Sequence, residues 1–157
     1  MRIEKILVAT DFGDASTEAL DAARTIADAC GASLQLLHVI DDPLAAPPTL
    51  DEERRIACAR LETLLQAEDR RDRRASVACE VGTPAREIAR YAGDHGVDLI
   101  VMGTHRHGSS HRMAAGSIAE RVVGSAQCAV LAVKSAAEPP CDEWLDPPAA
   151  PLDRQDR

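Results

Sequence analysis

A short apolar run that ends on a glycine and opens into a polar loop is the feature that most constrains the fold of this chain. Residues 99–102, Leu-Ile-Val-Met, are too few for a helix and apolar on both faces of an extended segment. Such a run is typical of a central strand in a parallel sheet covered on both sides. Gly103 would let the backbone approach a ligand closely, and Gly116 and Ser117 precede a helical pattern whose first N–H groups favour anions, phosphates above all. The stretch 97–117 therefore predicts a buried strand that leads into a phosphate- or nucleotide-binding loop.

Strand-like and helix-like patterns alternate along the chain. Apolar runs bounded by turn residues predict strands, and apolar residues at three- and four-residue spacing predict helices. We expect strands within 3–10, 33–40, 75–81, 99–102 and 128–134 and helices at 15–30, 50–67, 84–95 and 117–125. This order predicts a three-layer α/β fold, in which a parallel sheet of five strands carries helices on both faces.

The composition is that of one acidic globular domain. A chain of 157 residues with a formal net charge of −8 fits a single domain and lacks the basic face that nucleic acids and anionic membranes require. No segment approaches the ~18 apolar residues of a membrane span. We expect the domain to cover residues 1–135, and the Pro-, Ala- and Asp-rich residues 136–157 to form a disordered acidic tail.

Cysteine usage and one charged run carry further structural expectations. The five cysteines are odd in number and form no C-x-x-C pair, so they are typical of small core residues in a reducing cytoplasm. Cys128 in particular is interpreted as a core residue and not as a reactive thiol. The charged run at 68–74 mixes both signs at the expected end of a helix, so we interpret it as a solvated turn, with a basic patch as the alternative.

The expected carboxyl ends of the strands carry groups suited to a ligand. In open α/β sheets, ligands bind outside these ends, where the winding direction reverses. If the first and fourth strands are neighbours, Asp11 faces the glycine after the fourth strand, and its carboxylate can accept hydrogen bonds from ribose hydroxyls. The exposed backbone at Val39 and Ile40 could contact a base edge. Asp11 is alternatively a cap of the first helix, although Asp14 and Ser16 also offer caps.

Four segments carry a family resemblance when they are taken together and in order. They are VATDF at 8–12, GTPAREIARYA at 82–92, VDLIVMGTH at 97–105 and GSIAERVVGSAQCAVLAV at 116–133. Together they resemble the universal stress protein family over residues 1–134. The resemblance implies an adenine-nucleotide alpha hydrolase-like fold with five parallel strands in the order 3-2-1-4-5. It also implies a homodimer joined through the last strand, Ala129 to Val133.

One branch of this family binds ATP through the pattern G-x-x-G, nine residues, then G-[ST]. Here the pattern runs from Gly103 to Gly116 and Ser117 with its spacing intact, but Arg106 occupies the second glycine position. Its side chain should obstruct close approach to phosphates, although its guanidinium could pair with one. The resemblance implies ATP or another adenine nucleotide, with or without Mg2+, bound by Thr10, Asp11, Val39, Ile40, Met102, Gly103, His105, Arg106, Gly108, Gly116, Ser117 and Ile118.

Alternatives remain for the same loop. His105, His107 and His111 have a spacing that can place imidazoles on zinc or nickel, although surface histidines without a ligand are more common. No residue stands out as a nucleophile or general base, so we expect no catalytic residues and at most slow ATP hydrolysis. The competing function is a stress protein that has lost nucleotide binding through Arg106 and acts through dimerisation and partner docking.

Overall fold

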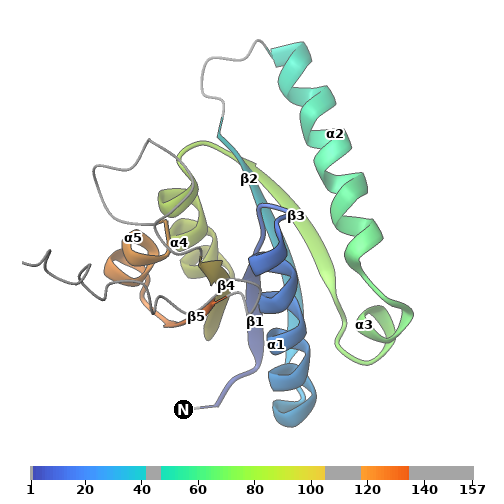
Figure 1. Cartoon of the computed structure of the whole chain (residues 1–157), viewed down its shortest axis with the longest axis vertical. Helices are drawn as coiled ribbons and strands as arrows, with labels where there is room; N and C mark the ends of the chain where they lie inside the picture. Colours follow the sequence, from blue (N-terminus) through green and yellow to red (C-terminus); the bar gives the residue numbers. More distant parts are fainter. Residues whose placement is uncertain (1, 42–46, 105–117, 135–157) are drawn as a thin grey trace, which may run out of the picture.

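The computed structural model describes residues 2–41, 47–104 and 118–134, which form a five-stranded parallel sheet between two layers of helices (Figure 1). The strands lie in the order β3-β2-β1-β4-β5, and each neighbouring pair is parallel. Their bounds are β1 Lys5–Ala9, β2 Ser33–Ile40, β3 Ser76–Val81, β4 Leu99–Thr104 and β5 Ala129–Lys134. The predicted α/β class and the strand order implied by the family resemblance are therefore confirmed.

Helices cover both faces of the sheet, with α1 and α2 on one face and α4 and α5 on the other. A short helix, α3, follows α2. The bounds are α1 Asp14–Cys30, α2 Pro47–Leu64, α3 Ala67–Arg71, α4 Pro84–His95 and α5 Ile118–Ser125. Within the described ranges, none of these helices has both the length and the apolar character needed to cross a membrane.

The central strands are apolar on both faces because each face packs against a layer of helices. In β1, Ile6 and Val8 are fully buried in the core formed with α1 and α2, whereas Leu7 and Ala9 belong to the core on the α4 and α5 face. Successive side chains of a strand point to opposite faces. Residues 99–102 of β4 are buried on both faces in the same way, which confirms the strand predicted from this apolar run.

The interpretation of the charged run at 68–74 as a solvated turn is wrong in part: five of its seven residues are exposed, but the side chain of Asp69 is fully buried. The helix predicted at 50–67 ends at Leu64 as α2, and a separate short helix, α3, begins at Ala67 and occupies the first part of the run. Oδ2 of Asp69 lies 2.7 Å from Nη2 of Arg24 in α1, and its Oδ1 lies 2.7 Å from Nη1 of Arg73. The mixed charges therefore include an internal ion-pair cluster that fastens the connection before β3 onto α1.

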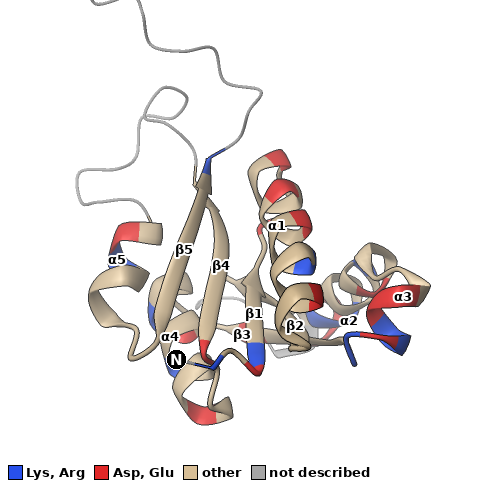
Figure 2. Cartoon of the chain, turned by 90° about the horizontal axis from the view of Figure 1, so that it is seen from below, with Lys and Arg blue, Asp and Glu red and all other residues tan. Residues whose placement is uncertain are grey.

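The outer strands of the sheet are β3 and β5. The position of β3 at an edge agrees with the strand order that the family resemblance implies. Figure 2 shows acidic residues along α1 and charges of both signs around α3. In this view, the described Lys and Arg residues lie among Asp and Glu residues.

Candidate functional site

The candidate site lies at the edge of the sheet where β1, β2 and β4 end. β1 pairs with both other strands, and Ala9 at its end lies in register with Leu37 of β2 and Met102 of β4. The predicted neighbourhood of the first and fourth strands is therefore confirmed. The strand order reverses its winding between β1 and β4, which is where open α/β sheets bind ligands.

Thr10 fixes the loop after β1 through hydrogen bonds of its backbone and its hydroxyl group. Its N–H donates to the Leu37 carbonyl at 2.9 Å, and its own carbonyl accepts a hydrogen bond from Nδ1 of His38 at 2.8 Å. Its buried hydroxyl accepts the Phe12 N–H at 3.0 Å and donates to the Ser16 hydroxyl at 3.1 Å. Thr10, one of the predicted site residues, therefore positions the groups that face the site.

The carboxylate of Asp11 organises the start of α1. Its Oδ1 accepts the Gly13 N–H at 2.9 Å and the Ser16 hydroxyl at 2.8 Å. Gly13 is the N-cap residue, so the prediction that Asp14 or Ser16 caps the helix is wrong: the Ser16 hydroxyl instead donates to Asp11. These bonds form the turn before α1, and no side chain caps the first N–H groups of the helix, so the capping alternative for Asp11 is wrong. Asp11 is exposed and lines a cavity, and its contact with a ligand stays a prediction.

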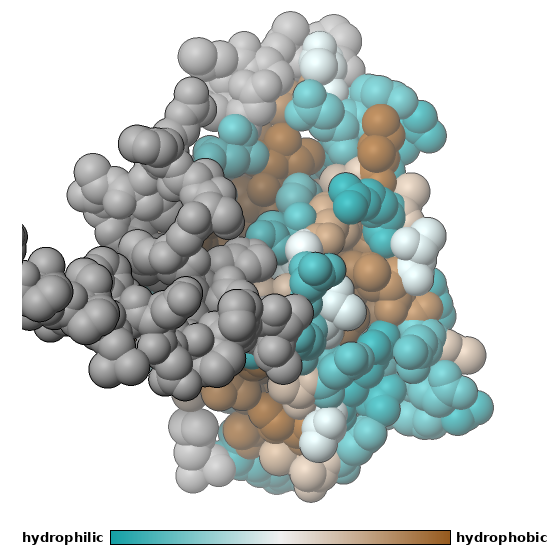
Figure 3. Space-filling view, viewed as in Figure 1, coloured by the Kyte–Doolittle hydropathy of each residue, from teal (hydrophilic) through white to brown (hydrophobic). Residues whose placement is uncertain are grey.

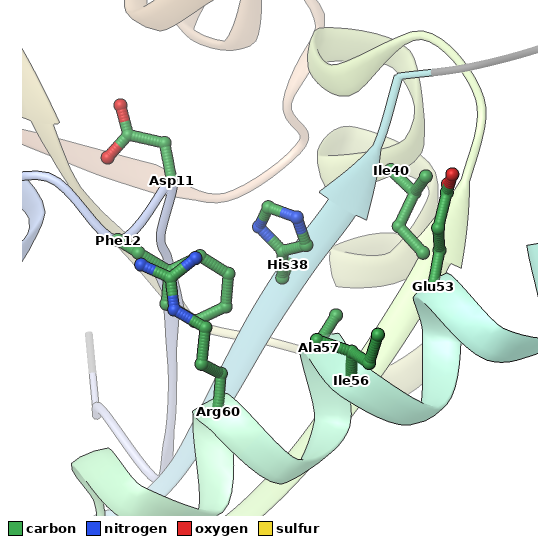
Figure 4. Close-up of a pocket in the computed structure, with 8 residues that line it drawn as sticks. All are labelled: Asp11, Phe12, His38, Ile40, Glu53, Ile56, Ala57 and Arg60. Carbon is green, nitrogen blue, oxygen red and sulfur yellow. The ribbon is translucent and has the colours of Figure 1, made fainter.

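Phe12 has a left-handed backbone conformation, with a φ of 66°, which a bulky L-residue rarely adopts. Such strain persists only where the surrounding structure holds it. The ring of Phe12 lies 4.5 Å from that of His38, centroid to centroid, and the guanidinium carbon of Arg60 lies 4.1 Å from the Phe12 centroid. We call Arg60, Phe12 and His38 the Phe12 cluster; it joins α2 to the ends of β1 and β2 (Figure 4).

A cavity of about 290 Å³ opens between α2 and the ends of β1 and β2. Asp11, Phe12 and His38 line it from the ends of β1 and β2, and Figure 3 shows apolar side chains among polar ones on this side of the molecule. One wall is a face of α2 formed by Glu53, Ile56, Ala57 and Arg60. Two carboxylates, a guanidinium and two rings beside apolar groups suit a small polar ligand with a flat part.

Sequence reasoning did not predict that α2 would form this wall. Ile56 fits the apolar stripe of a buried helix, yet it is 52% exposed because it lies at the cavity. Arg60 falls within the same stripe, and a charged residue there signals that the stripe leaves the core. Phe12 directly follows Asp11 and is the only phenylalanine of the chain. The charge of Arg60 and the single phenylalanine are therefore signals in the sequence, but neither signal shows which residue the side chain contacts.

The other predicted residues that the structure describes contribute mainly to packing. Met102 is buried and belongs to the core on the α4 and α5 face, against which Val39 and Ile118 pack. Ile40 lines the cavity with its side chain, and its carbonyl accepts the Gly82 N–H at 3.0 Å. Of these four predicted residues, Ile40 is therefore the one that the structure brings to the cavity beside Asp11.

Gly103 is required by close packing of helix on strand. A Cβ at this position would lie 2.4 Å from the carbonyl carbon of Ala15 and 2.6 Å from the backbone nitrogen of Ser16. The first turn of α1 therefore rests directly on β4, and only glycine leaves room for it. The described contacts give Gly103 this packing role, and its approach to a ligand stays a prediction.

Part of the predicted site lies outside the described residues, namely His105, Arg106, Gly108, Gly116 and Ser117. The alternative metal site, which also needs His107 and His111, lies there as well, as does the predicted tail at 136–157. In the part of the chain that the structure describes, no group of three or more His, Cys, Asp or Glu side chains could hold a metal ion.

Comparison with known proteins agrees with this fold. The model of the universal stress protein family matches residues 2–134. Universal stress protein MJ0531 from Methanocaldococcus jannaschii is 34% identical over 144 residues, which cover 83% of this chain and 82% of the relative. The solved structure of UspA from Lactobacillus plantarum has 30% identity and a TM-score of 0.69, and covers 85% of this chain and 99% of its own.

A further solved structure, that of a universal stress protein in complex with cAMP, has a TM-score of 0.61 and 24% identity. It covers 85% of this chain and 98% of its own, so it shares the fold. The match to the family model and the 34% identity to a full-length relative establish the family. The chain belongs to the universal stress protein family.

Proposed function

We propose that this chain is a cytoplasmic, dimeric module of a stress response that binds an adenine nucleotide. The observation that carries the proposal is the cavity beside the point where the winding reverses, in which Asp11 and the Phe12 cluster meet. A protein of the same fold was solved with cAMP, so in that protein the fold accommodates an adenine nucleotide.

Four side chains of the cavity suit parts of a nucleotide: those of Asp11, Phe12, His38 and Arg60. The carboxylate of Asp11 can accept hydrogen bonds from ribose hydroxyls, and the rings of Phe12 and His38 offer flat faces to a base. The guanidinium of Arg60 offers donors to an anionic oxygen. Gly116 and Ser117, just before α5, are the proposed phosphate-binding residues, for ATP or AMP, with or without Mg2+.

Asp11→Asn should weaken ATP binding roughly tenfold or more. Asparagine keeps an acceptor for the Gly13 N–H and the Ser16 hydroxyl, so the turn before α1 persists. The loss of charge removes charge-assisted hydrogen bonds to ribose, which are worth about 1.5–3 kcal/mol each. Titration calorimetry of both proteins with ATP, AMP and cAMP measures the change. Mass spectrometry of small molecules released from protein purified without added nucleotide identifies the natural ligand.

Asp14→Asn is the matched control for this substitution. Asp14 is an exposed acid in the first turn of α1 and is not among the residues that line the cavity. Its substitution should leave the affinity for ATP within about twofold, because Asp14 makes no contact in the cavity and an exposed charge is screened by salt. Both substitutions remove one negative charge, so a difference between them reports the contact of Asp11 and not the net charge. If the wild-type protein binds none of the three nucleotides, the proposal fails, and the competing function, partner docking without a nucleotide, is favoured.

The proposed homodimer forms through the outer edge of β5, residues 129–133. β5 is an outer strand of the sheet; its Leu131 is 37% exposed, and Val123 of the adjacent α5 is 58% exposed. An apolar outer strand is a template for pairing with another strand. Leu131→Glu should therefore convert the dimer to a monomer in size-exclusion chromatography with light scattering. Ile56→Glu, which alters an exposed apolar residue on α2, should leave it dimeric; a variant Leu131→Glu that stays dimeric would contradict this interface.

A further inference from the structure

Two thiols that the proposed nucleotide site does not use lie in direct contact. The Sγ atoms of Cys58 in α2 and Cys79 in β3 are 3.0 Å apart, and the Cys58 thiol donates to the Cys79 sulfur. A disulfide bond is about 2.05 Å long, so about 1 Å of approach separates this pair from a covalent link. The prediction that the cysteines are small core residues fits Cys79, which is buried, and is wrong for Cys30, which is exposed.

The surroundings hold the two sulfur atoms together and leave one of them accessible. Nη2 of Arg54 in α2 donates to the carbonyl oxygen of Cys79 at 2.8 Å, which fastens the helix to the strand at the same point. Cys79 is only 4% exposed, whereas Cys58 is half-buried. A small oxidant can therefore reach Cys58, and Cys79 is buried directly next to it.

We propose that Cys58 and Cys79 are a reversible dithiol–disulfide site that is oxidised by hydrogen peroxide. The Cys58 thiolate attacks one peroxide oxygen, the O–O bond breaks, and the departing hydroxide combines with the proton that Cys58 lost, which gives water and a sulfenic acid on Cys58. The Cys79 sulfur then attacks the Cys58 sulfur, the S–O bond breaks, and the second hydroxide combines with the proton from Cys79. The two thiols lose two electrons, and one peroxide becomes two waters.

The environments of the two thiols assign these roles. Burial is the largest cause that raises the pKa of Cys79; the hydrogen bond and charge of Cys58 and the charge of Glu80 add to the rise, Arg54 opposes it, and together they bring the pKa to about 12. The Cys79 thiolate is therefore scarce at neutral pH, so Cys79 is suited to be the resolving thiol and not the first to react. The contact of Cys79 with Cys58 compensates for the scarcity of its thiolate, because two groups that are already held together react without a diffusional encounter.

Peroxide treatment of the full-length protein, followed by alkylation and intact-mass measurement, tests the proposal. One equivalent of peroxide should protect two of the five cysteines from alkylation, and peptide mapping should place the bond between Cys58 and Cys79. Dithiothreitol should restore both thiols. The bond closes a loop between residues 21 apart, so the oxidised protein should melt roughly 5–10 °C higher than the reduced protein. Neither readout involves nucleotide, so the result is independent of the proposed function.

Three variants make the test specific. Cys58→Ser and Cys79→Ser should each abolish both the protection and the rise in melting temperature, whereas Cys30→Ser, which removes an exposed thiol at the end of α1, should leave both unchanged. Circular dichroism shows whether each variant is folded. If Cys79→Ser, which alters a buried residue, does not fold, Cys58→Ser alone provides the test. Stable sulfinic acid on Cys58, or disulfides between molecules in place of the link from Cys58 to Cys79, would overturn the proposal.

Discussion

Asp69→Asn should lower the free energy of unfolding by about 3–5 kcal/mol, because it removes the central negative charge of a buried ion-pair cluster. Oδ1 of Asp69 accepts from Nη1 of Arg73 at 2.7 Å, and Oδ2 accepts from Nη2 of Arg24 at 2.7 Å and from the Gln66 N–H at 2.8 Å. Both arginine side chains are only 13% exposed. An amide removes the buried charge between them, so Arg24 keeps only Asp21 and Arg73 keeps only Asp28 as a charged partner, and the NH2 group of the amide faces donors. Urea unfolding followed by circular dichroism measures the loss.

The same carboxylate makes the stability depend on pH in the acid range. Burial raises the pKa of Asp69, but hydrogen bonds from Arg24, the Gln66 N–H and Arg73 outweigh burial and leave the pKa below its usual 3.8. The unfolded chain therefore binds this proton more readily than the folded protein does. The stabilisation is complete above pH 3.8 and is lost as the pH falls through the folded pKa. The difference in unfolding free energy between the wild type and Asp69→Asn should accordingly shrink as the pH falls below 3.8.

Asp72→Asn is the control for the buried cluster. Asp72 pairs with Arg71, but their side chains are 51% and 70% exposed. Exposed ion pairs contribute little to stability, so this variant should unfold at nearly the same urea concentration as the wild type. Equal midpoints for Asp69→Asn and Asp72→Asn would show that the buried cluster does not fasten α3 to α1.

The elements that local signals mark could be predicted from the sequence almost residue by residue. The predicted bounds of β2, 33–40, and of α4, 84–95, agree with the structure. In α4, Thr83 is the N-cap residue, Pro84 begins the helix, and Gly96 ends it in a left-handed conformation with a φ of 61°. Each of these signals acts within a few residues, because cap geometry and hydrophobic periodicity are local properties of the chain.

The features that sequence reasoning missed depend on partners far apart in the chain. Asp69 pairs with Arg24, 45 residues away, and Arg60 lies over the ring of Phe12. A charged run, or a charged residue within an apolar stripe, shows that the hydrophobic pattern of a helix is interrupted. It does not show which distant residue the charged side chain contacts. The candidate site could be predicted in part, at Asp11 and Ile40, because the ends of parallel strands meet at one edge of the sheet.

Gly103→Ala should destabilise the protein by about 2 kcal/mol or more and also weaken nucleotide binding. The added Cβ would meet backbone atoms of Ala15 and Ser16, all within 2.6 Å, and backbone cannot move aside as a flexible side chain can. α1 must therefore shift away from β4. The shift would carry along Ser16, whose hydroxyl lies 2.8 Å from the Asp11 carboxylate. Urea unfolding and ATP titration of the same variant measure the two effects.

Gly93→Ala separates this packing effect from the general effect of replacing a glycine. Gly93 lies within α4, and no atom lies within 4 Å of the position of an added Cβ. Alanine there should raise the stability by about 0.5–1 kcal/mol, because it restricts the unfolded chain and favours the helix. The two substitutions add the same methyl group, so opposite signs can only reflect what each meets in the folded protein. If Gly103→Ala matched the wild type in stability and affinity, the first turn of α1 would be free to move on β4, and Asp11 would not owe its position to that contact.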